Sequence, residues 1–163
     1  MLMRTRTDAI KSKATNLAAR LSRSYQTLFR GFTWIGSEGD DAYHAFSASF
    51  DPMTELTAET FRAAARIDDA WKVEIAPAEP WFARMIQFFH DNQFGSENDH
   101  AIEIVYAHLQ EAMKATLEGP LSLASVHYAP SDGSTTFHKA RYYVFGRVAE
   151  GGLAGLMAKS VET

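Results

Sequence analysis

Apolar residues in the first thirty positions recur at the spacing of an α-helix. Between Asp8 and Phe29 they fall roughly along one helical face, and polar residues occupy most of the other positions. The residues on that face are Ile10, Leu17, Leu21, Tyr25 and Leu28. Gly31 and the stretch from Gly36 to Asp41 interrupt the pattern, since glycine favours turns. We therefore predict one long helix from Asp8 to about Phe29, followed by an exposed turn.

Three further helices are indicated by their ends as well as by their apolar residues. Thr57 is a good N-cap, Pro80 suits a first helical turn, and Ser96 with Asp99 three residues later resembles a capping box. The predicted helices run from Thr57 to about Ile67, from Pro80 to about His90 and from Glu97 to about Leu117. Gly119 and Pro120 are expected to end the last of them.

Alternating residues and short apolar runs between turn signals indicate strands. The predicted strands cover residues 43–50, 71–75, 121–128, 136–148 and 153–161. The last three follow one another without an intervening helix, and Gly151-Gly152 supplies a turn before the last. The C-terminal part of the chain is therefore expected to form an antiparallel meander.

The order of these elements places the chain in the α+β class. Helices and strands are mixed, and we expect helices to pack on both faces of the sheet. There is no internal repeat and no low-complexity linker in the 163 residues, so a single folded domain is expected.

The composition bears on the size of the core, on the cellular compartment and on membrane association. Hydrophobic residues make up 46% of the chain, which is enough for a substantial core. There is no cysteine, which excludes disulfides and thiolate metal sites and is compatible with a reducing compartment. No apolar run reaches the roughly 18 to 20 residues needed to span a membrane, and the N-terminus lacks a signal-peptide pattern. We expect a cytoplasmic protein.

The net charge of −4 has the wrong sign for general nucleic-acid binding, which needs clustered Lys and Arg. Seven of the sixteen basic residues precede residue 31, and we interpret them as a solvated helix face. No direct nucleic-acid binding is expected. An acidic body suits a basic protein partner instead.

Three histidines are the main candidates for a catalytic metal site. His127 and His138 are on consecutive predicted strands, and His44 could supply a third metal ligand. Phosphate-loop, dinucleotide-binding, zinc-protease and hydrolase-elbow motifs are all absent from the sequence. We favour dispersed histidines, no cofactor, no metal of the protein's own and no catalytic activity, with a small His-metal enzyme as the alternative.

Two acidic segments are candidate binding groups. Gly36 and Gly39 bracket Ser37-Glu38, a pattern typical of a tight exposed turn that projects a carboxylate, and Asp40 and Asp41 follow. At the chain end, Glu162 and Thr163 supply a carboxylate, a hydroxyl and the terminal carboxylate. Such hard oxygens suit a divalent cation or its bound waters.

Four segments together resemble the nuclease A inhibitor family. The strongest are Ser37-Glu38-Gly39-Asp40-Asp41-Ala42-Tyr43-His44-Ala45-Phe46 and the ending Gly152-Leu153-Ala154-Gly155 with Lys159-Ser160-Val161-Glu162-Thr163. Trp71-Lys72-Val73 and residues 94–101 fit less tightly, in the same order. The resemblance covers residues 25–163 as one domain and leaves residues 1–24 as a basic helical extension, with insertions within 50–92 and 129–136.

This resemblance implies a three-layer α/β/α sandwich related to pathogenesis-related protein 1. It also implies a function, because these inhibitors plug the active site of a magnesium-dependent, sugar-non-specific DNA/RNA endonuclease. A glutamate and a C-terminal threonine reach toward the partner's metal, and they correspond here to Glu38 and Thr163. Neighbouring contacts fall on Asn92, Gln93 and Phe94, with Asp40 and Glu162 beside the two main residues. An acidic binding module with a non-nuclease partner is the alternative.

Overall fold

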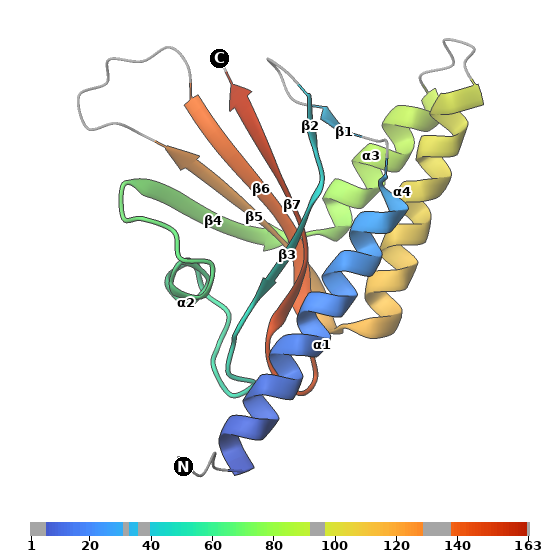
Figure 1. The fold of residues 1–163 in the computed structure, drawn as a ribbon. Helices are drawn as coiled ribbons and strands as arrows, with labels where there is room; N and C mark the ends of the chain where they lie inside the picture. The colour runs from blue at the N-terminus through green and yellow to red at the C-terminus, as the bar shows by residue number, and fades with distance from the viewer. Residues whose placement is uncertain (1–5, 31–32, 36–39, 92–96, 129–137, 163) are drawn as a thin grey trace.

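A five-stranded antiparallel sheet forms the centre of the protein in a computed structural model (Figure 1). The structure describes residues 6–30, 33–35, 40–91, 97–128 and 138–162. The strands are β3 (His44–Ala48), β4 (Trp71–Pro77), β5 (Glu118–Tyr128), β6 (His138–Arg147) and β7 (Leu153–Glu162). Their order across the sheet is β3-β7-β6-β5-β4. The strands β5, β6 and β7 pair in chain order, which confirms the predicted C-terminal meander.

Helices of unequal number cover the two faces of this sheet. On one face lie α1 (Arg6–Leu28), α3 (Glu79–Asp91) and α4 (Glu97–Thr116), while the short α2 (Ala58–Ala64) lies on the other (Figure 1). The predicted α+β class is confirmed. No helix in the described part of the chain combines the length and apolar character that crossing a bilayer requires.

The alternation of side chains along β6 divides the core into two clusters. Val144 packs in the cluster beneath α1, α3 and α4, whereas its neighbours Tyr143 and Phe145 pack against Phe61 of α2. Successive residues of a strand point to opposite faces, so one strand serves both clusters. The α2 cluster is aromatic, with the rings of Phe61 and Phe145 stacked at 4.7 Å between centroids.

Helix α1 is joined to the sheet by a buried serine. The hydroxyl of Ser22 accepts a hydrogen bond from the backbone N–H of Gly155 at 3.1 Å and contacts the carbonyl oxygen of Phe46. It thus lies between β3 and β7, bridging backbone groups that face each other in that pair. Ala14 and Ala18, before the predicted domain boundary at residue 24, are also buried. Helix α1 crosses that boundary without interruption and packs as one element.

The predicted elements differ from the observed ones mainly at their ends. Helix α2 begins after the capping box of Thr57 and Thr60, as the sequence indicated, but ends at Ala64 and not near Ile67. Arg66 has a φ of 54°, outside the range of a right-handed helix, which explains the earlier end. Strand β5 likewise begins at Glu118, before the predicted start at 121, with an irregular register as far as Ser122.

A small hairpin is the element that the sequence did not predict. It consists of β1 (Thr33–Ile35) and β2 (Asp40–Ala42), which pair antiparallel. The prediction that Asp40 and Asp41 belong to a turn is therefore wrong, since both lie in β2. Strands of three residues are too short to show an alternating pattern.

Candidate partner-binding site

The base of the β1–β2 hairpin is fastened to the C-terminal strand. Oδ2 of Asp41 accepts a hydrogen bond from the backbone N–H of Lys159 at 2.8 Å, and the same oxygen lies 3.2 Å from Nε2 of His44. The backbone pairing of β3 with β7 stops at His44, which lies opposite Met157. Two residues further along β7, the Asp41 carboxylate takes the place of a backbone acceptor for the N–H of Lys159. The hairpin and the C-terminal strand are thereby held side by side.

A buried pair of tyrosines fastens the same region to helix α4. Tyr43 lies between β2 and β3, and its hydroxyl is 2.6 Å from the hydroxyl of Tyr106. Burial raises the pKa of Tyr106 to about 12, and burial followed by the neighbouring Tyr106 raises the pKa of Tyr43 well above its usual value. Both hydroxyls therefore stay protonated and hydrogen-bonded at neutral pH.

Aromatic rings around this pair make the junction rigid. The ring of Phe29, just after α1, lies 4.5 Å from that of Tyr43 between centroids, and Phe89 of α3 stacks on Tyr106 at 5.7 Å. The side chain of Gln26 donates to the backbone carbonyl of Tyr43 at 3.1 Å. Three helices thus fix the position at which β2 passes into β3.

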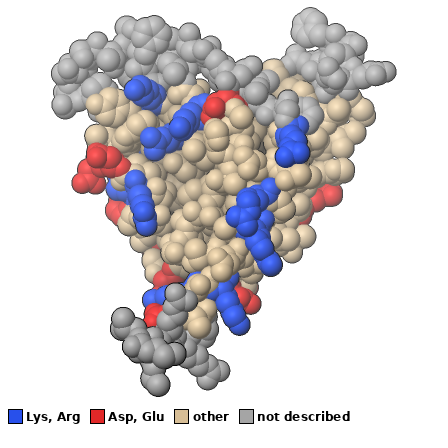
Figure 2. All heavy atoms as spheres, in the orientation of Figure 1, with Lys and Arg blue, Asp and Glu red and all other residues tan. Residues whose placement is uncertain are grey.

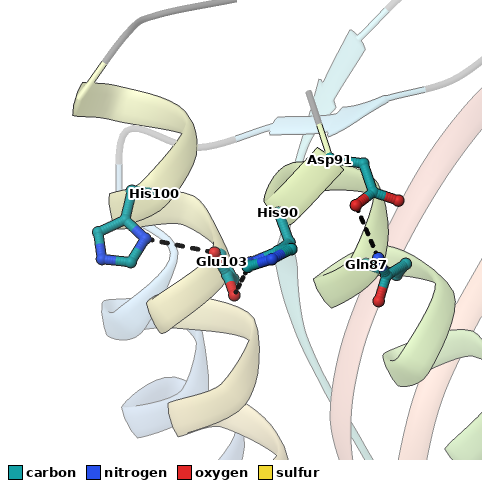
Figure 3. Close-up of polar contacts among 5 residues, drawn as sticks. All are labelled: Gln87, His90, Asp91, His100 and Glu103. Atoms are coloured by element: carbon teal, nitrogen blue, oxygen red, sulfur yellow. Dashed lines mark hydrogen bonds and ion pairs between the residues drawn. The ribbon is translucent and has the colours of Figure 1, made fainter. Parts of the chain in front are cut away.

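Polar contacts join α3 and α4 near the residues that connect them. Glu103 of α4 contacts two histidines, with Nδ1 of His90 at 3.1 Å and Nδ1 of His100 at 3.3 Å on different carboxylate oxygens (Figure 3). On α3, Gln87 donates to Asp91 at 2.7 Å. Both histidines are exposed, whereas Glu103 exposes only 19% of its side chain. These contacts hold the two helix ends together beside residues 92–96.

Three segments that are distant in sequence approach the same end of the molecule. The facing ends of β1 and β2, the end of β7, and the junction of α3 with α4 all lie at the upper end of Figure 1. They are the described elements that flank residues 36–39, residue 163 and residues 92–96. The Asp41 contact joins β2 to β7, and the Tyr43 contact joins the β2–β3 junction to the middle of α4.

The predicted site residues fall at or just beyond the ends of these elements. Asp40 begins β2 opposite Ile35, and Glu162 ends β7 opposite His138. The remaining ones lie outside the described residues: Glu38, Asn92, Gln93, Phe94 and Thr163.

The alternative histidine site does not assemble from His44 and His127. His44 is on edge strand β3 and His127 is on β5, with β7 and β6 between them, a separation of about 14 Å from ordinary strand spacing. Their register also places them on opposite faces, so they cannot ligate one ion. The side chain of His138 is outside the described residues. Among the residues described, no group of three His, Asp or Glu could hold a metal ion.

Sequence reasoning missed the contacts that organise this region. Asp41, Tyr43 and Lys159 all belong to the segments that resemble the inhibitor family, but nothing local in the sequence pairs Asp41 with Lys159 or Tyr43 with Tyr106. Tyr106 lies on the apolar face of a long helix and is indistinguishable there from an ordinary core residue.

Comparison with known proteins leaves the family open. No family model matches this chain, and no curated protein matches it either.

Proposed function

We propose that this protein inhibits a magnesium-dependent, sugar-non-specific endonuclease by inserting its Ser37-Glu38 turn and its C-terminus into the nuclease active site. The proposal includes a three-layer arrangement of the kind found in pathogenesis-related protein 1. It begins from the motifs around Glu38 and Thr163 in the sequence. Its main structural support is the Asp41–Lys159 hydrogen bond.

That bond supports the proposal because it joins the elements that carry both motifs. Asp41 is three residues after Glu38, and Lys159 is four residues before Thr163. A two-part plug requires that its parts keep a constant separation, since flexible parts lose entropy when they bind. The buried Tyr43–Tyr106 pair adds a second restraint from the helical layer. The chain thus has a stiff base for two acidic groups drawn from remote segments.

The chemistry of those groups suits the active site of such a nuclease. A catalytic Mg²⁺ with bound waters, surrounded by Arg and Lys, is prepared for a phosphate. The carboxylate of Glu38 and the terminal carboxylate beside the Thr163 hydroxyl supply the negative charge and acceptor oxygens of a phosphate. They offer no phosphodiester bond to break, so the nuclease would be occupied without turnover.

A plasmid-degradation assay tests this directly. Increasing amounts of the protein are added to a magnesium-dependent, sugar-non-specific endonuclease, and loss of supercoiled plasmid is measured. We expect inhibition that is complete near one inhibitor per nuclease. Glu38→Ala should weaken binding by about 2 to 5 kcal/mol if its contact is buried and charged. Deletion of Thr163 should also weaken binding while the thermal stability stays unchanged, because the deletion removes no residue of β7.

Glu55→Ala provides the matched control. Glu55 is an exposed carboxylate beyond the opposite end of β3, so its loss changes net charge equally without touching the proposed plug. Equal weakening by Glu55→Ala and Glu38→Ala would refute the plug and leave only general acid-to-base attraction. No inhibition of any of several such nucleases would favour an acidic binding module with a different kind of protein partner.

A further inference from the structure

The sheet face that carries α2 is only partly covered by that helix. Phe61 of α2 packs on Phe46, Tyr143 and Phe145. Strand register places a further set of residues on the same face, beyond Tyr143 in the direction of the chain end. This set, here called the open sheet patch, comprises Trp71, Tyr128, Lys139, Arg141 and Lys159. No helix of the described chain lies over it (Figure 1).

Positive charge is concentrated on the two central strands of the patch. Arg141 of β6 pairs directly with Lys159 of β7, and Lys139 follows two residues away on the same side of β6. Figure 2 shows basic side chains gathered over this part of β6 and β7. Like charges opposite each other destabilise a sheet. None of the three cations forms an ion pair with a described carboxylate.

Among the residues that the structure describes, the carboxylates near the patch lie at its borders. Asp41 belongs to β2, beyond β7, where its Oδ2 accepts from the backbone N–H of Lys159 and lies 3.2 Å from Nε2 of His44. Asp68 and Asp69 precede β4 at the other edge, where Asp68 accepts from the backbone N–H of Ala70. The described side chains at the centre of the patch are therefore basic, although the protein as a whole has a charge of −4.

Aromatic rings adjoin these cations. The guanidinium of Arg141 lies 4.6 Å from the centre of the Trp71 ring. Tyr128 pairs with Trp71 across β4 and β5, and the centroids of these two rings are 5.4 Å apart. Tyr128 is 37% exposed, a large fraction for an aromatic side chain in a sheet. Cations next to accessible aromatic rings are the surface that unpaired nucleotides need, because phosphates bind the cations and bases stack on the rings.

A groove continues from the patch toward the sheet edge. It has a volume of about 610 Å³ and runs between β3 and the C-terminal end of α2. Tyr143 and Met157 form part of its wall, each two residues from a patch cation on the same face, and Arg66 adds a further basic side chain. A flexible chain-like ligand bound to the patch can thus continue into this groove toward the edge of the sheet.

We propose that the open sheet patch binds single-stranded nucleic acid. This function is separate from the proposed nuclease inhibition and uses a different face. It departs from the expectation based on net charge, since a sum over the chain conceals a local separation of charge. An acidic peptide would satisfy the cations but would leave the ring of Tyr128 without a role, so a nucleic-acid strand fits the whole patch better.

Fluorescence anisotropy with a fluorescein-labelled twenty-nucleotide oligothymidylate, and with oligouridylate of equal length, tests the proposal. Three phosphate contacts predict an affinity that falls about 20-fold between 50 and 200 mM KCl. The Lys139→Ala/Arg141→Ala/Lys159→Ala variant should lose most of this salt dependence. Tyr128→Ala should raise Kd at least about fivefold by removing a stacking surface.

Lys114→Ala is the control, because Lys114 is a half-exposed lysine on α4, away from the patch. Circular dichroism establishes that each variant folds. If the triple variant does not, Lys159→Ala replaces it, because that side chain is exposed. Three results would overturn the proposal: no binding at 50 mM KCl, equal losses for Lys114→Ala and the patch variants, or full displacement by polyglutamate with Tyr128→Ala unchanged. The last result would assign the patch to an acidic protein.

Discussion

The carboxylate of Asp41 accepts a hydrogen bond from the backbone N–H of Lys159, 118 residues later in the chain. This contact joins a three-residue strand, too short to be stable alone, to a central strand of the sheet. It therefore fixes the position of β2 relative to β7.

Replacement of Asp41 should therefore distinguish the role of this hydrogen bond in positioning the hairpin from its role in the stability of the fold. We expect Asp41→Ala to lower the free energy of unfolding by only about 1 kcal/mol, because the contacts that are lost, with the Lys159 N–H and with His44, are partly exposed. Asp41→Asn retains an acceptor oxygen and should behave closer to the parent. Under the proposed function, inhibition of the nuclease should decline more for Ala than for Asn. Urea unfolding measures the stability, and the plasmid assay measures the inhibition. Equal inhibition by both variants and the parent would show that the Asp41–Lys159 hydrogen bond does not position the inhibitory segments.

The tyrosine pair should show strong coupling. Tyr43→Phe removes the hydrogen bond between the two hydroxyls and should cost about 1 to 3 kcal/mol, and Tyr106→Phe removes the same bond from the other side. The double variant removes both polar groups and should lose clearly less than the sum of the two single losses. Urea unfolding of the four proteins measures this coupling. Tyr128→Phe is the exposed control, and additive losses would contradict the interpretation.

Alkaline pH should destabilise the fold through the same pair. The pKa of Tyr106 is about 12 in the folded protein, above the value near 10 in an unfolded chain, and the pKa of Tyr43 is raised in the same direction. The unfolded state thus releases these protons first, so the stabilising contribution is present below pH 10 and is lost as pH rises toward 12. Each such tyrosine contributes up to about 1.4 kcal/mol per pH unit in that window. Unfolding measured from pH 9 to 11.5 should show a shallower decline in the Tyr43→Phe/Tyr106→Phe variant.

Gly155 should tolerate no side chain. A Cβ there would lie 2.0 Å from the carbonyl oxygen of Val144 and 2.7 Å from Cα of Phe145, both backbone atoms that cannot rotate away. We expect Gly155→Ala to cost about 3 kcal/mol or more, or to prevent folding. Gly119→Ala is the matched comparison. Gly119 has a φ of 69° but nothing within 4 Å of an added Cβ, so only about 1 kcal/mol of backbone strain is expected. Thermal unfolding should therefore give a lower midpoint for Gly155→Ala than for Gly119→Ala, and similar midpoints would contradict the steric explanation.

The elements that the sequence predicted well are those with local signals. The long helix α1, the capped start of α2 at Thr57 and the C-terminal strands follow from periodicity, capping and turns, which depend only on near neighbours. The motifs around Glu38 and Thr163 are also local, but the family resemblance that they suggest stays a prediction. The hairpin of β1 and β2 was missed because three residues carry no period.

The sequence by itself determined the α+β class, the order of most helices and strands, and the segments that carry candidate acidic groups. Only the tertiary structure decided which distant residues meet. Strand register puts Arg141 opposite Lys159, and helix packing brings Tyr106 to Tyr43. The same register moves His44 and His127 to opposite faces. These pairings depend on non-local register and packing, since a shift of one residue would turn every side chain of a strand to the other face.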